Sequence, residues 1–327
     1  MRADTNAEIT LGQLMESGAK DIPVWSLDDR LKLVPRTLTH AFPSGTKPVF
    51  ELTLTSGRRI TATGNHKFLT YDGWMPLSEL TPGSRLGAVR HVPPPLEVAP
   101  RDEDEIVLLA HMLGDGSFVK RQPIRYVSID EANLASVGNA AAGRFGITPK
   151  RDEYAAARVT TLRLPAPYHL THGKRNPIAA WLDEDGLFGL RSHEKFVPDW
   201  VFGLPKAQVG LFIKHIWATD GSIGYDEKNN LGRVYYASTS RRLVDDLARL
   251  LLRYNVFTRD QASPQGRLPR RLSPLRVRRR EPAPLLRRDR RPRGARCEGG
   301  QPCRQVARRP RQHQPRHRAQ GGLGARP

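Results

Sequence analysis

The chain is poor in cysteine and contains no long apolar run. Only two of its 327 residues are cysteines, Cys297 and Cys303. They are too few for a disulfide framework, and their spacing fits no zinc or redox motif. No apolar run approaches the roughly 20 residues of a membrane span, and the N-terminus is polar and acidic, unlike a signal peptide. These absences disfavour a disulfide-rich secreted domain and a membrane protein, so we expect a cytoplasmic chain.

The last fifth of the chain lacks most residues that build a core. Residues 261–327 contain no Lys, Phe, Tyr, Trp, Ile or Asn, but they contain ten Pro and 20 Arg against three acids. Most of the formal charge of +20 therefore lies here. Such a composition cannot offset its ordering entropy, which predicts a disordered tail over 260–327. Two interpretations stay open: a basic arm that neutralises phosphates, or an out-of-frame translation of a GC-rich gene.

Residues 1–90 are β-rich in pattern. Apolar Phe50, Leu52 and Leu54 alternate with polar residues, and a turn at Ser56-Gly57 leads into a second alternating stretch. This pattern predicts a hairpin with one buried face inside a small all-β module. The stretch HVPPPLEVAP at 91–100 then predicts a stiff linker, followed by a mixed α and β domain over 101–259.

That second domain contains an internal repeat. The stretches LLAHMLGDGS at 108–117 and IKHIWATDGS at 213–222 share an apolar run that ends in Asp-Gly-Ser. Asp102 is expected to cap the helix that leads into the first motif. Each motif is followed by a strand-like segment and then by a helix, the first ending near Gly146 and the second running from Ser240 to Asn255. We therefore expect an α+β chain with two similar halves related by an approximate twofold axis.

The repeat brings two acids together. Small residues Ala110, Gly114 and Ala218 allow the two repeated helices to approach closely, which places Asp115 beside Asp220 at their C-terminal ends. Two carboxylates, two negative helix ends and exposed carbonyls make a hard-oxygen site suited to Mg²⁺. An ion there can polarise a phosphodiester and activate water. A turn-forming role explains each Asp-Gly taken singly, but not the matched pair.

At these motifs the chain resembles the LAGLIDADG family of homing endonucleases in its double-motif form. The resemblance implies two αββαββα halves whose sheets form a saddle over double-stranded DNA, with Asp115 and Asp220 binding the metal. The segment KFVP at 195–198 resembles a lysine-containing block between the motifs, which implies a catalytic role for Lys195. The alternative for Lys195 is a surface lysine beside a loop proline.

The first 90 residues resemble a partial intein splicing (Hint) module. Thr63 and His66 match the TxxH block, in which the histidine helps activate the upstream splice junction. Longer stretches at 21–29 and 158–183 resemble inteins of actinobacterial replicative DNA helicases. The resemblance covers roughly residues 1–259 and implies, as the DNA target, the helicase gene without its intein.

Residues that splicing requires are absent. The chain begins Met1-Arg2-Ala3-Asp4, without an initial Cys or Ser, and contains no His-Asn dipeptide. We therefore expect an intein truncated at both ends that does not splice by itself. The second repeat also runs into the arginine-rich tail where its last two strands belong, so we expect it to be incomplete, with impaired cleavage.

Basic and aromatic residues near the predicted strands are candidates for DNA contact. They are Lys120, Arg121, Arg125, Arg233 and Tyr235. The leading hypothesis is a monomeric intein fragment that carries a Mg²⁺-dependent DNA endonuclease. The alternatives are a DNA-binding protein of the same fold that does not cleave, and an interaction protein that binds through its basic tail.

Overall fold

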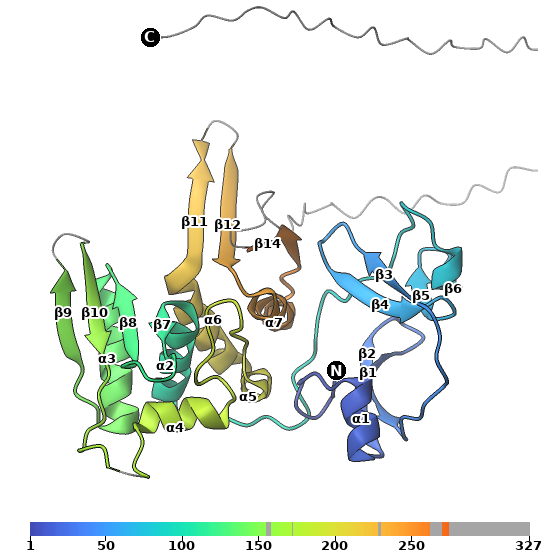
Figure 1. The fold of residues 1–327 in the computed structure, drawn as a ribbon. Coiled ribbons are helices and arrows are strands. Elements are labelled where there is room, and N and C mark those ends of the chain that lie inside the picture. Colours follow the sequence, from blue (N-terminus) through green and yellow to red (C-terminus); the bar gives the residue numbers. More distant parts are fainter. Residues whose placement is uncertain (155–157, 172, 228–229, 262–269, 275–327) are drawn as a thin grey trace, which may run out of the picture. The chain divides into compact units, whose positions relative to one another are not determined.

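The computed structural model describes residues 1–154, 158–171, 173–227, 230–261 and 270–274. Most of the predicted tail therefore lies outside the described residues. Within them the predicted α+β class is confirmed, because a β-rich N-terminal module precedes two units that each combine helices with a four-stranded sheet (Figure 1).

The N-terminal module consists of short hairpins. Its three two-stranded antiparallel sheets pair each strand with the next one in sequence. The elements are α1 (Leu11–Ser17), β1 (Ile22–Leu27), β2 (Leu33–Leu38), β3 (Val49–Thr53), β4 (Arg59–Thr63), β5 (Lys67–Thr70), β6 (Gly73–Pro76) and the 3₁₀ turn Leu77–Glu79. The helix α1 was not predicted, although Thr10 and Gln13 form the reciprocal capping box that starts it.

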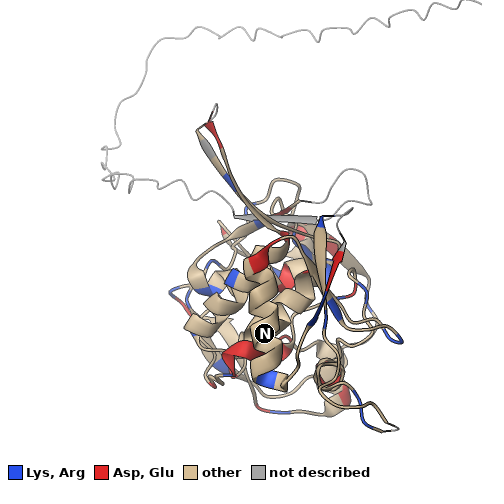
Figure 2. Cartoon of the chain, turned by 90° about the vertical axis from the view of Figure 1, so that its left-hand side faces the viewer, with Lys and Arg blue, Asp and Glu red and all other residues tan. Residues whose placement is uncertain are grey.

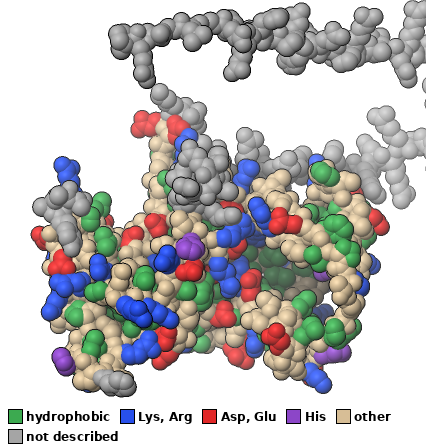
Figure 3. All heavy atoms as spheres, in the orientation of Figure 1, with side chains coloured by type: hydrophobic (Ala, Val, Ile, Leu, Met, Phe, Trp, Pro, Cys, Tyr) green, Lys and Arg blue, Asp and Glu red, His purple; other side chains and the backbone are tan. Residues whose placement is uncertain are grey.

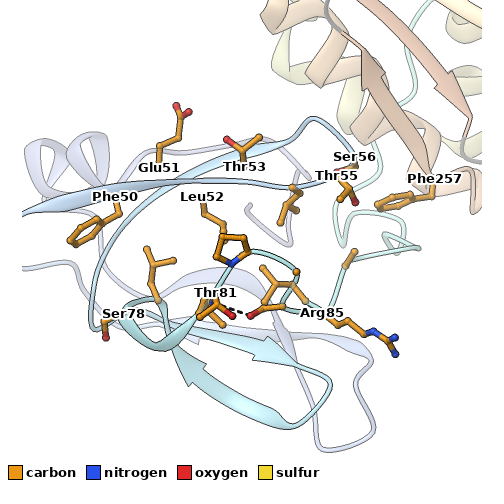
Figure 4. A pocket seen from close by; sticks show the side chains of 18 residues that line it. Phe50, Glu51, Leu52, Thr53, Thr55, Ser56, Ser78, Thr81, Arg85 and Phe257 are labelled. Carbon is orange, nitrogen blue, oxygen red and sulfur yellow. Dashed lines mark hydrogen bonds between the residues drawn. The ribbon is translucent and has the colours of Figure 1, made fainter. Parts of the chain in front are cut away.

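The predicted hairpin forms, but its apolar face is only partly buried. Strands β3 and β4 pair across the turn at Ser56-Gly57, while Phe50 and Ile60 stay 53% and 38% exposed. The apolar side of β3 lines a hollow of about 870 Å³, opposite the segment 77–88 (Figure 4). The expectation of a buried face is therefore met only in part, because little packs against this side of the hairpin.

The two repeats share one topology. The first consists of α2 (Glu103–Gly114), β7 (Gly116–Ser117), β8 (Arg125–Ser128), α3 (Glu131–Phe145), β9 (Lys150–Tyr154) and β10 (Val159–Arg163). Helices α4 (Pro177–Glu184) and α5 (Asp199–Phe202) lead to the second. It consists of α6 (Lys206–Asp220), β11 (Gly221–Asp226), β12 (Leu231–Ser238), α7 (Arg241–Leu251) with the 3₁₀ turn Leu252–Tyr254, β13 (Thr258–Gln261) and β14 (Arg270–Pro274).

The second repeat has all four strands of its sheet, so the expectation that the last two are missing is wrong. Its strand order β11-β12-β14-β13 matches the order β7-β8-β10-β9 of the first. Strand β14 pairs with both β12 and β13, and the sheet thus continues past the boundary predicted at 259. Backbone pairing to strands already in place holds β14, and composition alone does not reveal such pairing.

Local signals fix the helix ends as predicted. The carboxylate of Asp102 accepts a hydrogen bond from the backbone N–H of Asp104 and caps α2. Helix α3 ends at Gly146, whose φ of 62° suits a glycine. Ser240 caps α7 through the N–H of Leu243, and Asn255 closes the following turn with a φ of 60°. The predicted extents of these helices are confirmed.

One hydrophobic core joins the two repeats. It includes nearly all of α2 and extends through α3, α4, α6 and α7. Tyr126 on β8 and Tyr236 on β12 are both fully buried, and each pairs with the glycine that follows a motif aspartate, Gly116 or Gly221. The sheets therefore rest on the helices in the same way in both repeats. Among the described residues, no helix combines the length and apolarity needed to cross a membrane.

Candidate functional site

Helices α2 and α6 pack tightly at their C-terminal ends. A Cβ added at Gly114 would lie 2.0 Å from Oγ1 of Thr219, so only glycine fits there. Ala110 is fully buried, as close packing requires. The expected role of Ala218 is wrong, since its side chain is exposed and Thr219 makes the contact instead. The rotation of α6 about its own axis turns Thr219, the residue before Asp220, towards α2.

The packing brings Asp115 and Asp220 into electrostatic contact. Asp115 caps the C-terminus of α2, and Asp220 is the last residue of α6. Figure 2 shows acidic residues (red) and basic residues (blue) distributed over the helices and the sheets. Burial and the charge of Asp220 raise the pKa of Asp115 to about 6. Loss of hydration also raises the pKa of Asp220, although its side chain stays exposed. The predicted pair therefore shares one environment, open to solvent on the Asp220 side.

Lys195 lies beneath this pair and is not a surface lysine, being only 3% exposed. Its ammonium donates to the carbonyl oxygens of Met112, Gly114 and Gly116, at 2.9, 3.3 and 2.8 Å. The charges of both aspartates oppose the effect of burial, which lowers the pKa of Lys195 to about 8. These carbonyls are therefore occupied by an ammonium, and not exposed as expected.

The acid pair suits a hard divalent cation. Both carboxylates are disfavoured as anions by reduced hydration, and Asp115 also by its neighbour, so a bound cation would remove this cost. Within the described residues no group of three or more His, Cys, Asp or Glu side chains is arranged so that it could hold a metal ion. Mg²⁺ binds through one or two carboxylates and retains several waters, so two aspartates are compatible with it.

A hydrogen-bonded chain of three side chains crosses the helix pair near the acids. Nδ1 of His111 lies 3.0 Å from the Tyr126 hydroxyl, and Nε2 lies 3.0 Å from Nδ1 of His215. Burial, with a smaller effect of His215, lowers the pKa of His111 to about 4. The sequence analysis missed this chain, although His111 and His215 occupy neighbouring positions in the two motifs and could have signalled it.

The TxxH residues lie in a turn of the N-terminal module. Strand β4 ends at Thr63 and β5 begins at Lys67, so His66 follows a strand as predicted. The His66 N–H donates to the Thr63 carbonyl, and the Thr63 hydroxyl donates to Asn65. The His66 imidazole is exposed, with its ring 5.1 Å from that of Phe68. The turn therefore presents the imidazole to solvent.

The predicted DNA-contacting residues fall on two sheets and one loop. Lys120 and Arg121 are exposed in the loop between β7 and β8. Arg125 on β8, and Arg233 and Tyr235 on β12, alternate with the buried tyrosines and so belong to the face away from the helices. Figure 3 shows basic and acidic side chains interspersed on the surface in view, consistent with the nearly balanced charge of the first 260 residues.

Several curated proteins are similar in sequence to this chain. A protein named replicative DNA helicase DnaB from Synechocystis is 35% identical over 265 residues, which cover 79% of this chain and 29% of that protein. The protein of the same name from Nostoc is 38% identical over 76% of this chain and 28% of its own length. A Mycobacterium tuberculosis protein RecA is 29% identical over 73% and 30%. The chain thus spans less than a third of these relatives.

Solved structures are also similar in part. The crystal structure of a DnaB intein from Synechocystis is 33% identical, covers 27% of this chain and 62% of its own, and has a TM-score of 0.26. The structure of I-DmoI in complex with DNA and Mn is 14% identical, covers 53% and 89%, and has a TM-score of 0.33. Both TM-scores are low, so the assignment to a family rests on the sequence.

The family profile described as the intein splicing domain matches residues 2–290, which is most of the chain. This match includes the TxxH turn, the linker and both repeats with their aspartates. The chain therefore belongs to the intein splicing domain family.

Proposed function

We propose that this chain is part of an intein from a replicative DNA helicase precursor and that its two repeats form a divalent-metal-dependent DNA endonuclease. The observation that carries the proposal is the electrostatic contact of Asp115 with Asp220, made by two helices of a duplicated unit. A duplicated unit matches the approximate twofold symmetry of duplex DNA, so one centre can serve both strands. The resemblance of the two motifs to LAGLIDADG endonucleases supports the same reaction.

In the proposed reaction each residue of the centre has a separate task. The carboxylates of Asp115 and Asp220 would hold the divalent ion, preferably Mg²⁺, which supplies a Lewis acid for the phosphodiester and an activated water. Lys195 is a positioning residue, because its ammonium binds the helix end that carries Asp115. Its charge also partly offsets the rise in the pKa of both aspartates that burial causes, and so favours their ionised, metal-binding form at neutral pH.

The relatives support the proposed host and target. Two of them named replicative DNA helicase are 35% and 38% identical to this chain. The proposed target is the helicase gene without an intein, around the insertion point. Lys120, Arg121, Arg125, Arg233 and Tyr235 are the proposed DNA contacts, with Thr63 and His66 in the splicing module. An actinobacterial source, a cytoplasmic location and a monomeric state stay predictions.

The test uses the full chain and a supercoiled plasmid that carries an intein-free replicative helicase gene. In Mg²⁺ the chain should linearise the plasmid at one site, and EDTA should prevent this. Asp115→Asn and Asp220→Asn should each reduce the rate by at least about 100-fold, since each removes a charged ligand from the centre.

Asp183→Asn is the matched control, because Asp183 is an exposed aspartate of α4 whose Oδ2 pairs with Arg175. It should cut at the rate of the unsubstituted chain. Binding of the plasmid without nicking, unchanged by Asp115→Asn or Asp220→Asn, would contradict the proposal and favour a DNA-binding protein that does not cleave.

A further inference from the structure

The outer face of the first sheet contains a polar hollow of about 640 Å³. It lies over β8, β9 and β10, on strands whose opposite face rests on the helices. Its lining is formed by Pro123, Arg125, Arg151, Asp152, Glu153, Thr161 and Arg163. A pair of β-strands can enter the major groove of DNA, where the edges of the bases are exposed.

Two arginines meet across the strands of this hollow. Arg125 on β8 and Arg163 on β10 are cross-strand partners in the sheet register. Like charges in directly opposite positions repel, so the arrangement needs an anion nearby. Asp152 on β9 provides it, with its carboxylate 2.5 Å from Nε and 2.8 Å from Nη2 of Arg163. Such a two-point contact fixes the plane of the guanidinium.

Arg125 is held differently. Its Nε is buried and has no hydrogen-bond partner among the described residues. A buried donor without a partner is costly, and the guanidinium would lose this cost by turning towards a ligand that supplies an acceptor. The unpaired donor of Arg125 therefore favours an acceptor-rich ligand in this hollow. Asp152 fixes the guanidinium of Arg163 in the same hollow.

We propose that Arg125, Arg163 and Asp152 form a guanine-reading site on the first sheet. Guanine presents two acceptors, O6 and N7, in the major groove, and arginine donates to both. Asp152 is a positioning residue that sets the guanidinium plane of Arg163. Its negative charge also repels phosphates, so the site favours base edges over the DNA backbone. The proposal deepens the proposed function and rests on it.

The second sheet provides an internal comparison. There Asp226 on β11 lies 3.0 Å from Nη2 of Arg233 on β12, again on the outer face. Exposed ion pairs of this kind add little to stability, so their removal should leave the fold intact. The two pairs lie on different sheets and should therefore affect different halves of one DNA site.

The experiment is a binding selection with the full chain. The probe is a library of DNA duplexes with a randomised central segment, in Ca²⁺ so that binding is read without cleavage. Base preferences are determined for the unsubstituted chain and for Asp152→Asn, Arg125→Gln, Arg163→Gln and Asp226→Asn. Asp183→Asn is the matched control, because Asp183 is an exposed aspartate on α4 that also pairs with an arginine and does not line the hollow.

The unsubstituted chain should select a long site with guanine at one or two positions in one half. Arg163→Gln and Asp152→Asn should weaken the preference for the same guanine by about tenfold. Arg125→Gln should weaken the preference for a guanine in the same half of the site. Asp226→Asn should change the base preferences in the other half, and Asp183→Asn should change neither half. For a duplex of random sequence, Asp152→Asn should steepen the dependence of affinity on salt by about one unit of slope.

Two results overturn the proposal, and they are distinguishable. If the unsubstituted chain selects a site and both Asp152→Asn and Arg163→Gln keep every preference, the reading site is wrong while the endonuclease stands. If the unsubstituted chain selects no sequence at all, site-specific recognition itself fails.

Discussion

The two repeats have the same topology but different surroundings. Helix α2 is buried along most of its length, whereas α6 buries only Val209, Phe212 and Ile216. The buried positions of α2 are Glu105, Ile106, Leu108, Leu109, Ala110, His111, Met112 and Leu113. Accordingly Asp115 is partly buried and Asp220 exposed. A duplicated sequence thus gives a symmetric scaffold, while the electrostatics of the centre are asymmetric.

The asymmetry arises from what covers each helix. Helix α2 packs against α3 as well as α6, so water is excluded from two of its sides. The buried Lys195 comes from the connection between the repeats and binds three carbonyls of the first repeat. The helix that carries Asp115 is therefore fixed by groups outside its own repeat, and substitutions in this region should test the difference.

The largest effect on stability is expected for Lys195→Met. This change keeps the length of the side chain but leaves three carbonyl oxygens of the first repeat without their donor. The free energy of unfolding should fall by about 3 kcal/mol, measured by urea denaturation, because unpaired buried carbonyls are costly. The loss of a positive charge should also raise the pKa of Asp115 further.

Lys214→Met is the control in the second repeat, since Lys214 is exposed on α6. It should change stability by less than about 0.5 kcal/mol. Equal effects of the two substitutions would contradict the claim that the first helix end depends on a buried lysine.

The next effect concerns acid stability through His111. In the folded chain its pKa is about 4, below the ordinary value of 6.5, because it is buried beside His215. The folded state therefore binds fewer protons than the unfolded state between these values. The stability due to neutral His111 is present above pH 6.5 and is lost as the pH falls towards 4, by about 2 kcal/mol between pH 7 and 4.5.

His111→Gln keeps a polar side chain that does not titrate. In urea denaturation at both pH values, the unsubstituted chain should lose about 2 kcal/mol more than this variant. The same loss in both proteins would show that His111 is not the group that senses acid.

The sequence predicted those features of the fold and of the candidate site that depend on residues close together in the chain. Asp102, Gly146 and Ser240 mark helix ends because capping involves residues close together in the chain. The pair of aspartates was predicted because the duplication is visible in the amino-acid sequence. The contact of His111 with His215 depends on how one helix rotates against another, and no single stretch of sequence encodes that rotation.

A further effect of similar size tests the contact between the helices. Gly114 and Thr219 each precede a motif aspartate and face one another, with space for only one Cβ. Gly114→Ala should destabilise the chain by about 2 kcal/mol through overpacking. The double variant Gly114→Ala with Thr219→Gly should recover part of this loss, which a thermal melt would show. No recovery would mean that the two residues do not share the contact.

This contact also shows where sequence reasoning fails. Ala218 was predicted at the interface because it is small, yet Thr219 occupies that place. Size alone does not say which side of a helix faces its partner. Strand β14 was missed for a similar reason, because its place in the sheet depends on pairing with β12 and β13.

The central claim is that one aspartate from each repeat binds the same divalent ion. Calorimetric titration with Mn²⁺ should be carried out on the full chain, Asp115→Asn, Asp220→Asn and the double variant. If the ion is shared, each single variant should lose most of the affinity, and the double variant should lose little more. Losses that add in the double variant, or a single variant that binds as tightly as the unsubstituted chain, would contradict a shared centre.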